Sequence, residues 1–328
     1  MMKKRKVGKL KVSEIGMGCM GFSHGYGAIP SEDYAVEAIH KAYDFGCTFF
    51  DTAEVYGPNL LPENMGHNER IVGKAVESFR KDIVLATKIH PRTESLAQGK
   101  DLYTLVREHL IASLERLKTD YVDLYYLHRV EKGVPVEDVA EVMGKLIGEG
   151  LIRGWGLSQV GADTLAKAHA VTPVSAVQNL YNMLERDCEK DIFPYCLQNN
   201  VGVVPFSPVG SGLLSGKITA STQFEKVDDV RNWVPQLSKE NIAGNQPIVD
   251  LLRQYADKKG ATPAQISLAW MLHKYPNVVP IPGSKNQERI LENLGACNVT
   301  LSDEEFTALE TALDAIPVHG HRGHVESL

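Results

Sequence analysis

Four residues of the types that move protons stand at related places in the first part of the chain. Asp51, Lys88 and His128 each end a short apolar run, and Tyr56 follows soon after Asp51. A tyrosine with its ordinary pKa of about 10 is a poor acid at neutral pH, but a neighbouring ammonium group stabilises the tyrosinate and lowers that pKa. Lys88 could act in this way if Asp51 holds it, and His128 could orient a carbonyl oxygen or relay the proton. Such a set suits the protonation of an alkoxide, the product of adding a hydride to a carbonyl group.

Each of these residues also has an ordinary structural explanation. Asp51 and Lys88 could form a structural ion pair, Tyr56 could be a plain loop residue, and His128 could be a core histidine with satisfied hydrogen bonds. Their shared position argues against this, because a charge at the end of a buried strand is costly without a partner. If the strands are parallel, their carboxyl ends meet on one face, and the four side chains converge on one pocket.

The chain that must position these residues alternates between short apolar runs and amphipathic stretches. The runs are rich in valine, isoleucine and aromatic residues, which is typical of parallel strands buried on both faces. Strands are expected at residues 13–19, 47–51, 83–88, 122–128, 152–158, 174–179, 201–206 and 278–281. Helices are expected at residues 32–45, 103–117, 136–148 and 187–198, and a last helix is expected from the N-cap Ser302 to residue 315.

Eight strands, each followed by a helix, predict an α/β fold of the TIM (β/α)8 barrel type, with the active site at the carboxyl ends of the strands. A doubly wound open sheet is the competing architecture. A hairpin at residues 5–12, around Gly8, is expected to cap one end, and extra C-terminal helices follow the barrel. Residues 1–328 are expected to form a single domain, because no linker or repeat interrupts them. The longest irregular stretch, residues 217–245, is expected to be a functional loop.

Composition argues against several other classes of protein. The net charge of −6 does not suit a nucleic-acid partner, and no run of about 18 apolar residues predicts a membrane span. The basic start, residues 1–6, is not followed by the apolar segment of a signal peptide. Five cysteines, without a CxxC pair, indicate a reducing, cytoplasmic compartment and no metal site. The oligomeric state is left open.

Three other motifs look like ligand sites and are interpreted otherwise. Residues 16–21 match GxGxxG, but the expected helix opens only near residue 32, whereas a Rossmann fingerprint needs its helix to start inside the glycines. Residues 210–217 are similar to a Walker A loop, yet Ser211 and Ile218 stand where glycine and serine or threonine are required. This glycine-rich backbone could still bind phosphate. The tail histidines at 319, 321 and 324 are expected to belong to a frayed polar terminus rather than a metal site.

Several motifs, taken in order along nearly the whole chain, resemble the aldo-keto reductase family. They are residues 51–57 (DTAEVYG), 86–88 (ATK), 126–129 (YLHR) and 281–286 (IPGSKN), followed by the pairs 289–290 (RI) and 292–293 (EN). The Leu-His-Arg form of the third motif is similar to that of bacterial and plant members. The resemblance implies a TIM barrel, NADPH-dependent reduction of aldehydes or ketones, and a catalytic tetrad of Asp51, Tyr56, Lys88 and His128, with Tyr56 as the proton donor.

The resemblance also implies where the cofactor binds. Ser284, Lys285 and Arg289 match the clamp for a 2′-phosphate, so NADPH is expected rather than NADH. A hydroxyl, an ammonium and a guanidinium near a helix start suit a phosphate, although Lys285 and Arg289 could also be a solvated helix start. Ser158 and Gln178, with Asn179 beside it, match positions that hold the nicotinamide amide, and Phe206 matches the aromatic residue that stacks on its ring. The other positions expected around the cofactor are Gly18, Met20, Asp51, Ser207, Val209, Gly212, Leu213, Ser215, Lys217 and Asn293.

A small carbonyl compound is the substrate that the resemblance implies. Its pocket is expected to be lined from the first loop and the long loop by Met20, Phe22, His24, Tyr26, Phe224 and Trp233, whose apolar character favours hydrophobic or aromatic aldehydes and ketones. The family usually reaches its Asn-Glu pair soon after Tyr56, but here residues 59–67 intervene, and they are expected to border the pocket or to mediate subunit contacts. Two alternatives stay open: an NADPH-sensing regulatory subunit similar to potassium-channel beta subunits, and a Rossmann dehydrogenase that uses residues 16–21.

Overall fold

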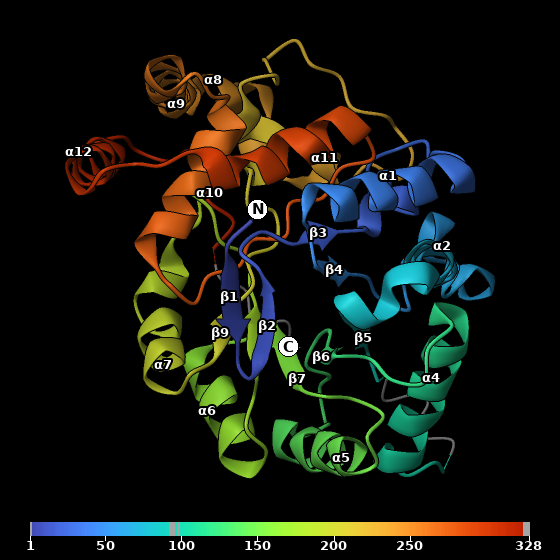
Figure 1. The fold of residues 1–328 in the computed structure, drawn as a ribbon. Coiled ribbons are helices and arrows are strands. Elements are labelled where there is room, and N and C mark those ends of the chain that lie inside the picture. Colours follow the sequence, from blue (N-terminus) through green and yellow to red (C-terminus); the bar gives the residue numbers. More distant parts are fainter. Residues whose placement is uncertain (1, 92–95, 97–98, 324–328) are drawn as a thin grey trace.

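The computed structural model describes residues 2–91, 96 and 99–323. It shows parallel strands surrounded by helices (Figure 1). Seven strands pair in sequence order, each parallel to the next. They are β3 (Met17–Gly18), β4 (Phe49–Asp51), β5 (Val84–Ile89), β6 (Leu124–Leu127), β7 (Trp155–Ser158), β8 (Ala176–Gln178) and β9 (Gly202–Val203). Six of them fall within a predicted run, and β5 extends one residue beyond the predicted run at residues 83–88.

Residues 278–283 close the ring, because they bridge to β9 on one side and to β3 on the other. The carbonyls of Pro280 and Pro282 accept hydrogen bonds from the N–H groups of Gly16 and Gly18, at 2.9 and 3.4 Å. A proline has no N–H to donate, so this seam cannot form a continuous ladder. The prediction of a TIM-type barrel is therefore confirmed, and the open sheet is excluded.

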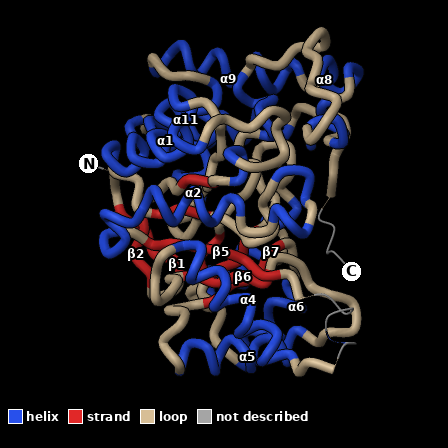
Figure 2. The backbone as a smooth tube through the Cα atoms, turned by 90° about the vertical axis from the view of Figure 1, so that its right-hand side faces the viewer, coloured by secondary structure: helices blue, strands red, loops and turns tan. Residues whose placement is uncertain are grey.

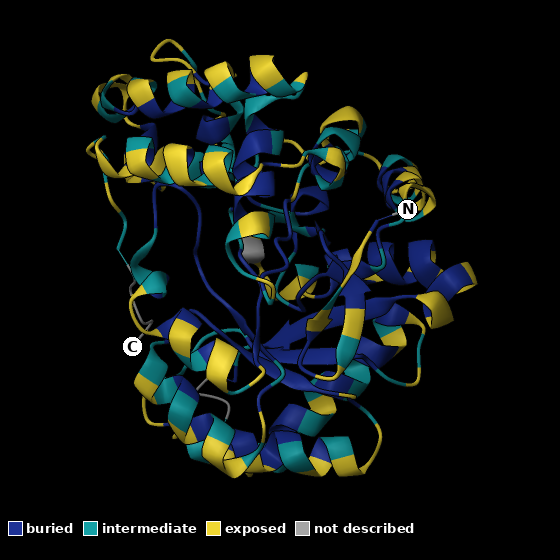
Figure 3. Ribbon diagram, turned by 60° about the vertical axis from the view of Figure 1, so that its left-hand side comes forward, coloured by how far each residue is buried: buried dark blue, intermediate teal, exposed yellow. Residues whose placement is uncertain are grey.

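Helices cover the outside of the barrel and turn their buried faces toward the strands (Figure 3). The predicted helices at residues 32–45 and 136–148 have the predicted bounds. The helices are α1 (Glu32–Phe45), α2 (His67–Val76), α4 (Leu102–Leu117), α5 (Val136–Gly148), α6 (Ala162–Val171), α7 (Ile192–Gln198), α8 (Lys239–Gly244), α9 (Gln246–Lys259), α10 (Pro263–Lys274), α11 (Gln287–Leu294) and α12 (Asp303–Asp314).

Two predictions about local structure are wrong. The helix expected at residues 187–198 is split into a 3-10 turn and α7, because the Asp191 side chain accepts the N–H of Ile192 and starts α7 anew. The stretch at residues 217–245 is only partly irregular: it contains two 3-10 turns and α8, whose first turn is capped by Ser238. In both places short polar caps decide the structure, and caps leave little periodicity to detect.

The predicted hairpin consists of β1 (Lys4–Val7) and β2 (Leu10–Ser13), joined at Gly8. Figure 2 shows it at one end of the strands, while the long loops lie at the opposite end. Val7 and Val12 are fully buried against apolar residues of the barrel interior. The hairpin therefore plugs the amino end of the barrel and leaves the carboxyl end for a pocket.

The segment at residues 319–323 is ordered, so the prediction of a frayed terminus is wrong for these residues, while residue 324 lies outside the described part. The Asn245 side chain bonds to the backbone N–H and carbonyl of His319, both at 2.9 Å. The buried carboxylate of Glu185 accepts the N–H of Arg322 at 2.6 Å and lies 2.9 Å from Nδ1 of His321. Tertiary contacts thus hold a segment whose sequence is only polar.

Within the described ranges, no helix combines the length and the apolar character needed to cross a membrane. The same residues contain no group of three histidine, cysteine or acidic side chains that could hold a metal ion. All five cysteines are free thiols, and four of them are buried.

Candidate active site

The carboxyl ends of β4, β5 and β6 bring together the four side chains singled out in the sequence. The ammonium of Lys88, which is fully buried, donates hydrogen bonds to the carboxylate of Asp51, to the carbonyl of Thr52 at 2.7 Å and to the hydroxyl of Tyr56 at 3.3 Å. The ring of Tyr56 stands edge-on to that of His128, with 5.7 Å between the centroids. Neighbouring parallel strands place these groups on one face, as expected.

The environment of Lys88 keeps its side chain charged. Burial by itself lowers the pKa of Lys88, but the nearby Asp51 and Tyr56 outweigh burial and raise that pKa above its usual value. Asp51 is held in turn by the side-chain amide of Gln178, whose Nε2 lies 2.9 Å from the second carboxylate oxygen. A fixed ammonium therefore faces the phenolic oxygen.

His128 is held in its neutral form. Burial, followed by the positive charges of Lys88 and Arg129, holds the pKa of His128 well below its usual value. A neutral imidazole at neutral pH can donate a hydrogen bond from one ring nitrogen, but it is a weak proton source. Between the two candidates for acid catalysis, this environment favours Tyr56.

A cavity of about 460 Å³ opens above these residues. Asp51, Tyr56 and His128 contribute to its wall, and Lys88 lies behind them. Of the other predicted residues, the structure places on this wall Gly18, Met20, His24, Tyr26, Ser158, Gln178, Phe206, Ser207 and Trp233.

Several residues expected near this pocket lie elsewhere in the structure. Phe22 is fully buried in the core, and Phe224 packs beneath the guanidinium of Arg231, so neither lines the cavity. The Asn179 side chain bonds to the N–H and carbonyl of Val160, at 3.2 and 2.8 Å, and so it holds the loop after β7 instead. Among the described side chains of residues 59–67, none lines the cavity.

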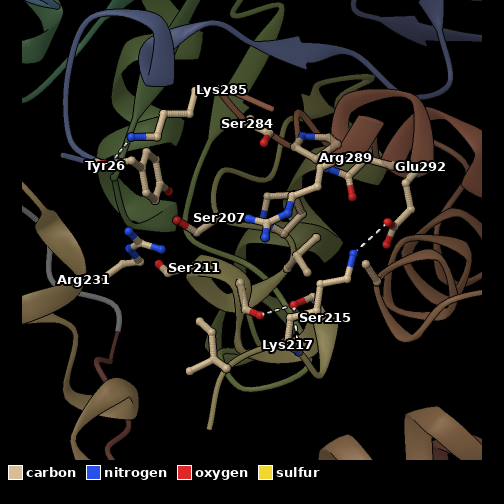
Figure 4. A pocket seen from close by; sticks show the side chains of 18 of the residues that line it. Tyr26, Ser207, Ser211, Ser215, Lys217, Arg231, Ser284, Lys285, Arg289 and Glu292 are labelled. Carbon is tan, nitrogen blue, oxygen red and sulfur yellow. Dashed lines mark hydrogen bonds and ion pairs between the residues drawn. The ribbon is translucent and has the colours of Figure 1, made fainter. Parts of the chain in front are cut away.

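A second cavity, of about 270 Å³, adjoins the first and shares Tyr26, Ser207 and Ser211 with it (Figure 4). Its wall includes most of the positions expected around a cofactor. These are Ser207, Val209, Gly212, Ser215, Lys217, Ser284, Lys285, Arg289 and Asn293. The side chain of Leu213 is fully buried in the core and is not part of this wall.

The three positively charged side chains expected here differ in the hydrogen bonds and ion pairs that they already form. Lys217 pairs with Glu292 at 2.9 Å, and the ammonium of Lys285 donates to the carbonyls of Tyr26 and Ala28, at 2.8 and 2.6 Å. The guanidinium of Arg289 points into the cavity in Figure 4, and among the described residues no hydrogen bond or ion pair of this group is found. Arg289 is thus the cation best placed for an anionic ligand.

The glycine motif at residues 16–21 has the structure that was expected of a strand end and loop. It forms β3 and a 3-10 turn, and α1 begins only at Glu32. At Gly18 an added Cβ would lie 3.0 Å from the carbonyl oxygen of Ile281, so glycine allows the barrel to close here. This geometry excludes the Rossmann alternative, since no α-helix begins within the glycine motif.

Sequence reasoning assigned no site role to six polar residues that line the cavities: Arg129, Ser211, Thr222, Arg231, Glu292 and Arg322. For Arg129 a signal was available, since it follows His128 at the same strand end. Arg231 lies on the long loop, where its pairing with Asp229 is visible only in the structure. Nothing in the sequence near Arg322 indicates that the tail returns to the pocket.

Comparisons with known proteins agree with this geometry. A family model described as the aldo/keto reductase family matches residues 14–314. A probable aldo-keto reductase 1 from Glycine max is 36% identical over 313 residues, covering 94% of this chain and 86% of that protein. Among solved structures, a glycerol dehydrogenase from Gluconobacter oxydans has a TM-score of 0.82 and 27% identity, over 99% of this chain and 96% of that one. An aldo-keto reductase from Klebsiella pneumoniae in complex with NADPH has a TM-score of 0.73 and 27% identity, over 100% of both chains.

Proposed function

The chain belongs to the aldo/keto reductase family, and on this premise we propose that it reduces aldehydes or ketones to alcohols with NADPH, using Tyr56 as the proton donor. One observation carries the proposal. The buried ammonium of Lys88, anchored by Asp51, lies 3.3 Å from the hydroxyl of Tyr56 at the wall of a cavity. This arrangement provides an acid and the charge that stabilises its conjugate base in one place.

Each member of the tetrad has a separate part in the proposed reaction. NADPH, when bound, supplies the hydride that forms the new C–H bond at the carbonyl carbon. As the electron pair of the C=O bond moves to oxygen, Tyr56 gives that oxygen its proton, and Lys88 stabilises the tyrosinate that remains. Neutral His128 orients the carbonyl oxygen by a hydrogen bond. Acid assistance of this kind typically accelerates a reaction by about 100- to 10,000-fold.

The residues of the second cavity fit NADPH. Arg289 and Ser284 offer a guanidinium and a hydroxyl near the start of α11, which suits the 2′-phosphate. Ser207, Ser211 and Ser215 also line this cavity and offer further polar contacts to a nucleotide. The Klebsiella pneumoniae relative that was solved with NADPH covers this whole chain, which supports the same cofactor here.

The proposed substrate is a small carbonyl compound. Met20, Val55, Val230 and Val234 give part of the first cavity an apolar wall, which suits a hydrophobic or aromatic body next to the carbonyl group. We place the reaction in the reducing environment of the cytoplasm, because all five cysteines are free thiols.

The proposal is tested by assaying a panel of aliphatic and aromatic aldehydes and ketones with NADPH and NADH side by side. We expect repeated turnover with NADPH and much weaker turnover with NADH. Tight retention of NADPH with negligible turnover across the panel would contradict the proposal and would favour the regulatory-subunit alternative.

A further inference from the structure

The C-terminal segment brings a positive charge to the cavity above the tetrad. Arg322 lies on the cavity wall, although it is distant in sequence from every strand end. Its backbone N–H is held at 2.6 Å by the buried carboxylate of Glu185, and the N–H of Gly323 lies 3.2 Å from the other oxygen. Asn245 fixes the segment further upstream, at His319. Arg322 is thus attached by its main chain, which leaves the side chain available.

A second guanidinium, that of Arg129, lines the same cavity. One terminal nitrogen of Arg129 donates hydrogen bonds both to Oγ of Ser158, at 2.9 Å, and to the carbonyl of His128. Burial, and after it the positive charge of Arg322, lowers the pKa of Arg129 from its usual value, while Tyr56 partly offsets this effect. Two like charges at one cavity are unfavourable until an anion lies between or beside them.

The carboxylates around the cavity are engaged by groups other than the guanidinium of Arg322. Asp51 is the acidic residue on the described wall, and Lys88 already neutralises it. Asp228 lies 2.7 Å from His24, and both oxygens of Glu185 are taken by the tail backbone, His321 and Gln236. Among the described residues, no ion pair of the Arg322 guanidinium is found. The guanidinium of Arg322 therefore has no carboxylate partner among the described residues that line the first cavity.

We propose that Arg322, supported by Arg129, recognises an anionic group on the carbonyl substrate, either a carboxylate or a phosphate monoester. This inference rests on the proposed carbonyl reduction and specifies its substrate class. The planar guanidinium suits both groups, since it can form two parallel hydrogen bonds to either. The apolar residues that line the same cavity as Arg322 and Tyr56 then receive the body of the substrate, so the preferred compounds have an apolar body and an acidic group.

Matched pairs of aldehydes test this inference. The carboxylate pair is 4-carboxybenzaldehyde and its methyl ester, and the phosphate pair is 4-formylphenyl phosphate and 4-methoxybenzaldehyde. In the unaltered enzyme we expect kcat/KM for at least one anionic aldehyde to exceed that of its neutral partner by about 10-fold or more. A hydrogen bond between charged groups typically strengthens binding by about this factor. The pair that shows the preference identifies which anion is used.

Variants assign the preference to Arg322. In Arg322→Gln, kcat/KM for the anionic aldehyde should fall by about 10- to 100-fold, while the neutral partner changes less than about 2-fold. Arg322→Lys should retain part of the preference for the anionic aldehyde, because lysine keeps the positive charge but cannot form the two parallel hydrogen bonds of a guanidinium. The dissociation constant of NADPH, measured by fluorescence titration, should stay unchanged in both. Arg107→Gln, on the outer surface of α4, is the matched control and should behave like the unaltered enzyme.

Three results would overturn the inference. They are no preference for either anion in the unaltered enzyme, an equal loss on charged and neutral aldehydes in Arg322→Gln, and weaker NADPH binding in that variant, which would assign the residue to the cofactor. In all three cases reduction of the neutral aldehydes would leave the proposed function intact. Absence of any aldehyde reduction by the unaltered enzyme would instead contradict the proposed function itself.

Discussion

The ammonium nitrogen of Lys88 lies 3.3 Å from the hydroxyl oxygen of Tyr56, and the carboxylate of Asp51 holds it there. All three groups come from two neighbouring strand ends, and Lys88 is fully buried while Tyr56 reaches the cavity. The charge is therefore shielded from water, where it acts more strongly on the phenol than it would at the surface.

Removing the hydroxyl of Tyr56 should stop the chemistry without disturbing the fold. We expect Tyr56→Phe to bind NADPH as before but to reduce aldehydes at least about 100-fold more slowly, because the proton donor is lost. Steady-state kinetics and a fluorescence titration of NADPH check both parts. The control is Tyr103→Phe on the surface of α4, whose hydroxyl bonds to Glu149 at 2.6 Å. Near-normal turnover by Tyr56→Phe would rule out Tyr56 as the acid.

Substituting Arg289 should separate the two nicotinamide cofactors. In Arg289→Ala the affinity for NADPH should fall by about 10-fold or more, since a charged hydrogen-bonding partner of the phosphate is lost, whereas NADH binding should change little. Lys285→Ala should have a smaller effect, because this ammonium already binds the carbonyls of Tyr26 and Ala28. Isothermal titration with both cofactors measures the difference. An equal loss for NADPH and NADH would show that Arg289 does not contact the 2′-phosphate.

The neutral state of His128 should make stability depend on pH. The folded pKa of His128 lies well below its usual value of about 6.5, so below that pH the unfolded chain takes up a proton that the folded chain does not. The free energy of unfolding therefore decreases as the pH falls below about 6.5. His128→Gln cannot titrate and should lose less stability between pH 7.5 and 5.5 in urea denaturation. Identical losses in both proteins would contradict the assignment, because the other histidines are common to the two.

A buried ion pair behind the tetrad should be important for folding. Glu69 is fully buried, with its two oxygens 2.6 Å from the Arg116 side chain and from the hydroxyl of Thr87. Arg116→Met leaves the carboxylate without its cation, so we expect the free energy of unfolding to fall by about 3–5 kcal/mol. The matched control on the same helix is Arg107→Met, which breaks a surface pair and should change stability far less. Equal effects of the two substitutions would show that burial does not strengthen the Arg116 contact.

The parts of the fold that repeat along the chain could be predicted from the sequence. Parallel strands buried on both faces leave continuous apolar runs, and each run ends near the predicted residue. The tetrad could be found for the same reason, because neighbouring strands place consecutive strand ends side by side. Local capping was harder to detect, and so the break before α7 and the start of α8 were missed.

Residues that reach the site through distant contacts could not be predicted. Arg322 depends on Glu185, which is separated from it by 137 positions, and no periodic pattern links the two. Phe22 and Phe224 show the opposite error: both are aromatic residues on loops near the pocket, yet the folded loops turn them into packing positions. Residue type and sequence position indicate which loops surround a cavity, but only the packed structure determines which side chains face it.

The seam between β3 and residues 278–283 has a consequence for synthesis of the chain on the ribosome. After β9 has emerged and until residue 283 follows, β3 and β9 are both unpaired edges of an open parallel sheet, and such edges recruit strands from other molecules. Between the emergence of residue 203 and that of residue 283, a nascent chain of this protein therefore carries both of these unpaired strand edges. Stalled or truncated products that end before residue 278 should accumulate in aggregates or on chaperones. Products that extend past residue 283 can close the ring, which leaves neither β3 nor β9 open to strands of other molecules.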